Sequence, residues 1–132
     1  MEEKVVVHLK DGKIHKGVTL DFAPGSESFH LLPAEGGGVP LKVVRESMKA
    51  LFYVKDYLGN RDFTARRHFE DQRRVGRRAI LTFEDGERIW GAIPEGEDPE
   101  SAGFFFMPED EEDNNLRIFV VKSSLQKLEL VN

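Results

Sequence analysis

Short apolar runs alternate with turn-forming residues along the whole chain. The run VVVHL at residues 5–9 leads to Asp11-Gly12, and the run ILTF at residues 80–83 leads to Asp85-Gly86. An Asp-Gly pair between β-rich segments is typical of a tight hairpin, because both residues tolerate the positive φ of a type I′ turn. The pattern therefore predicts a β-hairpin at the start of each half of the chain.

The correspondence between the two halves extends beyond these hairpins. Gly12 and Gly17 correspond to Gly86 and Gly91, FHLLP at 29–33 corresponds to FFFMP at 104–108, and VVRESM at 43–48 corresponds to VVKSSL at 120–125. The spacing between corresponding positions changes only in loop-like stretches, where insertions are tolerated. Units of about 50 residues have marginal cores. We therefore expect two homologous halves that pack against each other or against another copy.

Each half is predicted to contain five short strands with one helical turn before the last. The expected strands are 5–9, 14–22, 29–32, 41–44 and 50–54, then 78–83, 88–93, 103–107, 116–121 and 127–131. Between the halves, Thr64 can cap a short helix that begins near Ala65. The expected organisation is a first unit at 1–55, a basic connector with a short helix at 56–76, and a second unit at 77–132.

This order of elements resembles SH3-like and Sm-like small barrels, and the pattern VxxLxDGxxxxGxxxxF at 6–22 resembles the opening motif of the Sm-like family. The resemblance implies an all-β fold, a tandem repeat of two five-stranded SH3/Sm-like small barrels. It does not imply the family's RNA site. Sm-like RNA binders contact the base through an acidic residue and an asparagine, but here Ala23 follows Phe22 and no asparagine lies in 23–29. The Arg-Gly or Lys-Gly pair of the family's second motif is also missing, because Glu46 follows Arg45. The segment 48–60 also resembles an uncharacterised bacterial family of such barrels, some of which accompany PilZ domains.

Composition narrows the class of protein. Hydrophobic residues make up 39% of the chain, with 10 Phe and no Cys. This content suffices for a core, and it excludes disulfides and thiolate chemistry. The sequence shows neither an export pattern nor the run of about 20 apolar residues that a membrane span needs. We therefore expect a bacterial-type cytoplasmic protein with no cofactor and no membrane association.

Charge is distributed unevenly along the chain. Residues 1–54 are neutral, residues 55–78 carry a net charge of +4, and residues 79–132 carry −9. The basic stretch contains a dense group of arginines: Arg66, Arg67, Arg73, Arg74, Arg77 and Arg78. Arginine forks bind phosphate in bidentate fashion, so this cluster is a candidate phosphate or cyclic-dinucleotide site. The alternative is that these arginines pair with the acidic second half.

The spacing of Arg73 and Arg77, or of Arg74 and Arg78, resembles the RxxxR motif of PilZ domains that bind cyclic di-GMP. The second PilZ motif is absent, because Glu87 and Arg88 stand where a serine would be needed. The resemblance therefore supports a cyclic dinucleotide only as the alternative ligand.

The remaining candidates are aromatic, acidic and histidine side chains. Alternation along 103–107 sends Phe105 to the opposite face from its Phe neighbours, so Phe105 and Trp90 are predicted to form an interface between halves or subunits. The acidic stretch 108–115 lacks the spacing of a calcium loop and is expected to be a solvated tip. The four histidines show no metal-ligand spacing. No catalytic or metal residue is predicted.

These observations favour a non-enzymatic binding or assembly module that contacts a protein partner or another copy of itself. The alternative is a PilZ-like regulator that binds a cyclic dinucleotide or other phosphate ligand through the arginine connector. Nucleic acid is disfavoured, because the acidic second half would repel phosphates.

Overall fold

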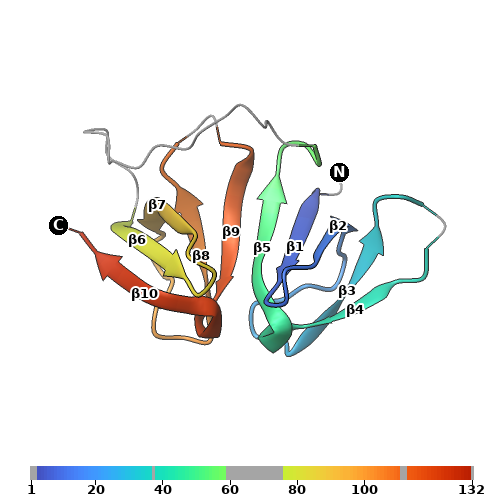
Figure 1. Cartoon of the computed structure of the whole chain (residues 1–132), viewed down its shortest axis with the longest axis horizontal. Helices are drawn as coiled ribbons and strands as arrows, with labels where there is room; N and C mark the ends of the chain where they lie inside the picture. The colour runs from blue at the N-terminus through green and yellow to red at the C-terminus, as the bar shows by residue number, and fades with distance from the viewer. Residues whose placement is uncertain (1–2, 37, 59–75, 111–112, 132) are drawn as a thin grey trace.

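The computed structural model describes residues 3–36, 38–58, 76–110 and 113–131 of the chain (Figure 1). These residues form an all-β structure in which the secondary elements are strands and two short 3₁₀ helices. The strands of the first half are β1 (Val5–Leu9), β2 (Ile14–Val18), β3 (Ser28–Pro33), β4 (Leu41–Val44) and β5 (Met48–Val54), with η1 (Arg45–Ser47) before β5. Those of the second half are β6 (Arg77–Phe83), β7 (Arg88–Ile93), β8 (Gly103–Pro108), β9 (Asn115–Val121) and β10 (Leu125–Leu130), with η2 (Lys122–Ser124) before β10.

The strands form one antiparallel sheet in the order β10-β6-β7-β8-β9-β5-β1-β2-β3-β4. Each half uses the same internal order, in which the fifth strand pairs with the first and the fourth strand ends the group. The halves are joined where β5 pairs with β9, and these two strands stand side by side at the centre of the molecule (Figure 1). The sheet is open, with β4 at one end and β10 at the other.

The opening hairpins of the two halves have the same register. Val5 lies opposite Gly17 in the first hairpin, and Ala79 lies opposite Gly91 in the second. Each tight turn contains a glycine with positive φ, 93° at Gly12 and 94° at Gly86. A type I′ turn needs positive φ at both central residues, but within the described residues only glycines have it, so Asp11 and Asp85 do not. The predicted hairpins are present, whereas the predicted turn type is wrong: one left-handed glycine closes each turn, and its N–H donates to the carbonyl oxygen of Leu9 or Phe83.

A second glycine pair lets the backbone of each hairpin approach the next strand. A Cβ atom at Gly17 would overlap the carbonyl oxygen of Leu32, and one at Gly91 would overlap that of Met107. Glycine inside a strand commonly marks such a close approach. The glycine therefore lets each hairpin bend against the third strand of its half.

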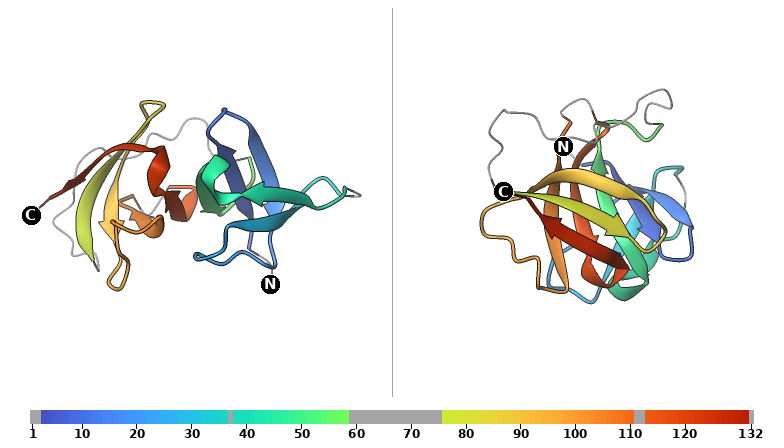
Figure 2. Two further views of the ribbon diagram at one scale, coloured as in Figure 1. Left: turned by 90° about the horizontal axis from the view of Figure 1, so that it is seen from below. Right: turned by 60° about the vertical axis from the view of Figure 1, so that its left-hand side comes forward.

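Two apolar clusters cover opposite faces of the central strands. One contains most of the buried side chains of the second half, including Phe83, Phe104 and Phe106, together with Phe52 and Val54 of β5. The other contains most of those of the first half together with Phe119 and Val121 of β9. The two groups of strands curve away from the central pair (Figure 2). Each half therefore completes the core of the other.

This arrangement explains why every residue of β5 is buried. From Ala50 to Val54 the side chains of β5 enter the two clusters in turn, since successive residues of a strand point to opposite faces, while Lys49 lies in the ion cluster at the cleft. Full burial of a large apolar side chain contributes about 1.5–3 kcal/mol. The strand that ends the first half is thus a main contributor to the stability of both halves.

The all-β prediction is confirmed, and the predicted strands lie close to the observed ones. The second strand is shorter than predicted and ends at Val18. Beyond it the Asp21 carboxylate accepts hydrogen bonds from Thr19 and from the backbone of His30, which fixes a loop in place of a continued strand. The predicted connector helix near Ala65 lies outside the described residues. Within those residues, no helix is long and apolar enough to cross a membrane.

Candidate binding surface

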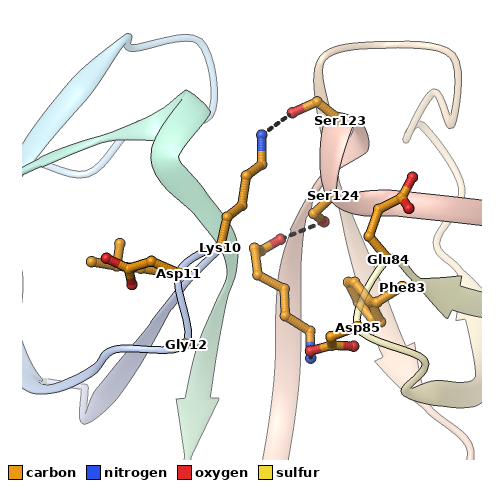
Figure 3. A pocket seen from close by; sticks show the side chains of 10 residues that line it. Lys10, Asp11, Gly12, Phe83, Glu84, Asp85, Ser123 and Ser124 are labelled. Atoms are coloured by element: carbon orange, nitrogen blue, oxygen red, sulfur yellow. Dashed lines mark hydrogen bonds and ion pairs between the residues drawn. The ribbon is translucent and has the colours of Figure 1, made fainter.

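A cleft of about 280 Å³ lies between the two halves (Figure 3). Its walls are the turn after β1 at Lys10–Gly12, the turn after β6 at Phe83–Asp85, and the serines of η2, Ser123 and Ser124. The Asp-Gly turns of the two hairpins therefore meet at the same cleft. This is a consequence of the β5–β9 pairing, which brings corresponding ends of the halves together.

Lys49 on β5 connects the two sides of this cleft. Its Nζ atom donates hydrogen bonds to Asp85 Oδ2 at 2.6 Å and to Glu87 Oε1 at 2.5 Å, and it lies 4.6 Å from the centre of the Phe83 ring. The Lys49 ammonium lowers the pKa of the Asp85 carboxyl, mainly through its hydrogen bond. Because two carboxylates face one ammonium, the three side chains carry no net positive charge that could attract an anionic ligand, and they act as a joint between the halves.

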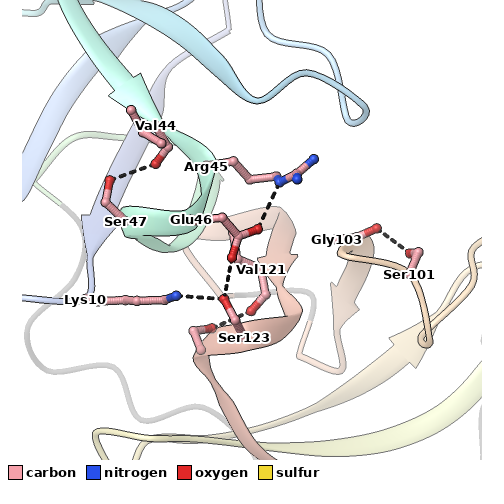
Figure 4. A network of polar contacts seen from close by, with 10 residues as sticks. Lys10, Val44, Arg45, Glu46, Ser47, Ser101, Gly103, Val121 and Ser123 are labelled. Carbon is pink, nitrogen blue, oxygen red and sulfur yellow. Dashed lines mark hydrogen bonds and ion pairs between the residues drawn. The ribbon is translucent and has the colours of Figure 1, made fainter.

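A second polar network joins the two 3₁₀ helices across the same cleft (Figure 4). Lys10 Nζ donates to Ser123 Oγ at 2.6 Å, and Ser123 Oγ donates to Glu46 Oε2 at 2.9 Å. This second bond lowers the pKa of the Glu46 carboxyl. Ser124 is buried, and its Oγ lies 2.9 Å from the carbonyl oxygen of Lys49. The cleft is therefore lined by groups that already bind each other across the junction.

His8 is a residue of β1 and lies close to Lys49 of β5. Its ring centre is 4.5 Å from that of Phe52, and burial, followed by the positive charge of Lys49, lowers the pKa of the His8 imidazole. Within the described residues, no group of three or more His, Asp or Glu side chains is placed to hold a metal ion. The arrangement around His8 is that of a neutral imidazole packed beside an ion cluster.

A larger hollow, of about 570 Å³, lies on the first half away from the junction. Its lining combines the apolar side chains of Ile14, Leu31, Pro33, Leu41, Tyr57 and Leu58 with the polar side chains of His15, Lys16 and Glu35. Leu31 and Leu41 lie opposite each other across the β3–β4 pair. One wall is secured by Tyr57, whose hydroxyl donates to the carbonyl oxygen of Gly17 at 2.8 Å. Since Leu58 and Ile14 are 83% and 52% exposed, the hollow presents apolar surface to solvent.

The hollow adjoins the β4 edge of the sheet. The backbone N–H of Arg45 donates to the carbonyl oxygen of Glu27, so Arg45 and Glu27 form a hydrogen-bonded residue pair at the end of the β3–β4 ladder. Hydrogen bonding alternates along an antiparallel pair, so the backbone groups of Lys42 and Val44 point toward the free edge. Val44 is 47% exposed and Val39, just before the strand, is 85% exposed. The β4 edge thus offers backbone donors and acceptors beside exposed apolar side chains.

The opposite edge, β10, has a different character. The side chains of Lys127 and Glu129 form an ion pair with an N–O distance of 3.5 Å, and Arg88 approaches the same carboxylate at 3.9 Å. Charged side chains on an edge strand protect it against pairing with another strand. The solvent-facing side of β4 has one charged side chain, Lys42, and next to it the exposed Val44. β10 is therefore the more heavily charged edge, and β4 is the edge with an exposed apolar side chain beside the hollow.

The arginine cluster predicted to bind phosphate is described only in part. Arg66, Arg67, Arg73 and Arg74 lie outside the described residues, while Arg77 and Arg78 are neighbours on β6. Successive residues of a strand point to opposite faces, so these two side chains diverge. Neither lines the cleft or the hollow.

The predicted interface aromatics are half-buried on neighbouring strands of the second half. Phe105 on β8 lies 5.3 Å from Phe119 and 6.2 Å from Tyr53 of β5, measured between ring centres, so it packs across the β5–β9 junction. Trp90 on β7 has the Arg88 guanidinium 4.9 Å from its ring centre. An intersubunit role of these two side chains stays a prediction.

The acidic stretch after β8 is more buried than the sequence suggested. Glu109, Asp110 and Asp113 are 3%, 8% and 9% exposed, whereas residues 111–112 lie outside the described part. Burial raises the pKa of the Asp113 carboxyl, which accepts a hydrogen bond from the backbone N–H of Asn115 at 2.9 Å. The described carboxylates therefore belong to the packed structure and do not form a solvated tip.

The hollow and the β4 edge were missed in the sequence. Their residues are dispersed from Ile14 to Leu58, and pattern reasoning assigned each one to a strand, a turn or the connector. One available signal was a comparison of the halves, because Lys42 stands where the second half has Phe119. That exchange marks a surface that is buried in one half and open in the other.

Comparison with known proteins gives one result. The model of a family of unknown function, DUF6982, matches residues 1–132. No curated protein and no solved structure matches the chain.

Proposed function

We propose, for a chain that belongs to the DUF6982 family, a role as a non-enzymatic protein-interaction module that binds an extended segment of a partner along β4. The observation that carries this proposal is the open β4 edge beside a hollow of about 570 Å³. An exposed sheet edge binds an added strand through main-chain hydrogen bonds, and a neighbouring pocket for side chains supplies specificity.

Three features favour this edge over the cleft between the halves. The cleft is bridged by Lys49 and Ser123, whose polar groups already have partners in the protein. The hollow instead exposes Ile14 and Leu58, and burial of such apolar surface is the main source of binding free energy. Both backbone groups of Lys42 and the N–H of Val44 face the free edge, while the Val44 carbonyl oxygen accepts a hydrogen bond from Ser47 Oγ at 2.7 Å.

The architecture that we propose for this module is two copies of one small SH3/Sm-like barrel, spanning 1–55 and 77–132 with the basic connector between them. The identical strand order, the identical hairpin register and the matched positive-φ glycines support this interpretation. We further propose that the protein acts in the bacterial cytoplasm without a cofactor.

Selection from a random heptapeptide library tests the proposal. Lys42→Pro removes an N–H that points away from β3, so it should preserve the fold and block strand addition. Leu130→Pro is the matched control on β10, since Val131 bonds to Arg78 and the Leu130 N–H therefore faces the other free edge. We expect selected peptides to lose at least about tenfold in affinity for Lys42→Pro and to bind Leu130→Pro as they bind the wild type. Failure to select peptides, or equal loss in both variants, would overturn the proposal.

The dense group of arginines between positions 66 and 78 favours a second candidate, a PilZ-like regulator that binds a cyclic dinucleotide or another phosphate ligand. Calorimetric titration with cyclic di-GMP at moderate salt distinguishes it from the first. If the peptide-binding proposal is right, the wild type shows no heat of binding at high micromolar ligand. Binding that Arg74→Ala abolishes would instead establish the second candidate.

A further inference from the structure

β4 and β9 hold the same place in the two halves of the sheet. Each is the fourth strand of its half and pairs on one side with the third strand, β3 or β8. The free side of β4 is therefore the counterpart of the side of β9 that receives β5. The protein itself shows which strand fits such an edge.

In the second half, an aromatic side chain from the added strand completes the core. Phe52 of β5 lies opposite Ile118 of β9, and both pack in one cluster with Phe106. The counterparts of Ile118 and Phe106 in the first half are Leu41 and Leu31, which line the hollow. The hollow thus lies where the counterpart of Phe52 would be, and a strand on β4 would fill it with a large apolar residue opposite Leu41.

The neighbouring position has the opposite chemistry in the two halves. Leu51 of β5 lies opposite Phe119 of β9, whereas the first half has Lys42 in place of that Phe. Lys42 is exposed, and its cross-strand neighbour His30 bonds to Asp21 at 2.7 Å. Opposite charges facing each other across a strand pair stabilise it. A strand on β4 is therefore complementary when it places an acidic residue opposite Lys42.

The third position calls for a small residue. Ala50 of β5 lies opposite Val120 of β9, and the counterpart of Val120 is Val43, which is 3% exposed. A large side chain opposite Val43 would meet a packed surface, while a small one repeats the observed pair. Along the added strand, these positions run small apolar, acidic and large aromatic.

A second copy of the chain does not have this pattern on its own free edge. β10 places Lys127 and Glu129 where β5 has Ala50 and Phe52. Head-to-tail pairing of β10 with β4 would set the Glu129 carboxylate opposite the aliphatic side chains of Leu41 and Leu31, which costs its desolvation. The edge residues therefore favour a different protein over self-assembly.

Resting on the proposed function, we infer the partner's chemistry: an extended segment with the triplet small apolar–acidic–aromatic binds antiparallel along β4. Its acidic residue faces Lys42 and exchanges backbone hydrogen bonds with it. Its aromatic residue enters the hollow between Leu31 and Leu41. The partner is thus a protein with an exposed segment such as Ala-Glu-Phe.

The probe is a labelled, capped peptide with the sequence of residues 48–54 carrying Leu51→Glu, which contains this triplet. Its affinity is measured by fluorescence anisotropy beside that of the same peptide carrying Leu51→Lys. We expect the acidic peptide to bind the wild type about fivefold more tightly, and the order to reverse with the Lys42→Glu protein. Adding Phe52→Ser to the acidic peptide should lower its affinity by at least about tenfold, since it removes the buried ring.

The outcomes separate the two proposals. If library peptides bind at β4 but the acidic and basic probes bind equally, the inferred partner chemistry is wrong and the interaction module stands. If the acidic probe binds and Leu130→Pro abolishes its binding while Lys42→Pro does not, the assignment to β4 is wrong. If neither library peptides nor probes bind the wild type, both proposals fall.

Discussion

Phe52 lies opposite Ile118 across the β5–β9 pair, and although the two residues come from different halves their side chains share one apolar cluster. The last strand of the first half is therefore part of the core of the second. Phe119 makes the reciprocal contribution to the first half, where it packs with Phe22 at a distance of 5.0 Å between ring centres. The halves are coupled by shared cores rather than by a surface contact.

This coupling predicts the effect of Phe52→Ala. Truncation leaves a cavity in the second half's cluster and should lower the free energy of unfolding by about 3–5 kcal/mol. Because both clusters meet on β5, we expect a single unfolding transition at lower denaturant concentration, followed by circular dichroism and tryptophan fluorescence together. Leu130→Ala, at a side chain that is 50% exposed, is the control and should change stability by less than about 0.5 kcal/mol. Two separate transitions in the Phe52 variant would contradict shared cores.

The glycines of the two bends give a paired prediction. Gly17→Ala and Gly91→Ala each place a Cβ against a carbonyl oxygen of the next strand, so each should destabilise the protein by about 1–3 kcal/mol. Gly25→Ala is the control, since among the described residues no atom beyond its two chain neighbours lies within 4 Å of the added Cβ. Chemical denaturation of the three variants provides the measurement. A cost at only one of the two bends would show that the hairpins are not equivalent.

Lys49→Met tests the joint at the cleft. The side chain of Lys49 is 9% exposed, whereas those of Asp85 and Glu87 are 56% and 49% exposed, so the carboxylates regain water when the ammonium is removed. We therefore expect a loss of only about 1 kcal/mol, well below the cost of leaving a buried charge unpaired. Lys127→Met is the surface control.

The same variant has a pH signature. Because the pKa of Asp85 is lowered in the folded protein, its ion pair stabilises the fold above the ordinary pKa of 3.8, and this contribution is lost as the pH falls through the lowered value. The stability difference between wild type and Lys49→Met should therefore shrink in strong acid. A difference that stays constant down to acid unfolding would argue against the ion pair.

His8 predicts a separate pH dependence. Burial lowers the pKa of the imidazole below 6.5, so between the folded value and 6.5 the unfolded chain binds more protons than the folded one. Stability should fall as the pH drops below 6.5, and His8→Gln should remove that part of the slope. Urea unfolding of both proteins between pH 7.5 and 5 measures it, with His15→Gln as the matched histidine control. An unchanged slope in His8→Gln would show that the wild-type dependence arises elsewhere.

Local chemistry determined much of the fold. The Asp-Gly turns at 11–12 and 85–86, the strand-forming runs beside them and the glycines at 17 and 91 predicted the two hairpins, because each depends on backbone conformations within a few residues. The correspondence between the halves predicted that both would use the same order. These features are decided by neighbours in sequence, so the sequence sufficed for them.

The junction was decided only by the tertiary structure. β5 reads as an almost continuous apolar run, and such a run shows burial on both faces but does not name the strands that cover it. Its pairing with β9 joins residues from opposite ends of the chain, for example Leu51 and Phe119, and depends on which free edges meet. Non-local pairing of this kind depends on the shapes of two assembled halves, which no local pattern contains.

For the candidate site too, the sequence determined one part and the tertiary structure the other. The sequence shows that Lys42 replaces the aromatic residue found at Phe119, and that Lys127 and Glu129 replace Ala50 and Phe52. Only the strand order shows that Phe119, Ala50 and Phe52 lie on β9 and β5, which pair at the centre of the sheet. It also shows that Lys42, Lys127 and Glu129 lie on β4 and β10, at the two ends of the sheet. The sequence gives the polarity of each residue, but whether the strand that carries it meets solvent or another strand follows from the packing of the whole sheet.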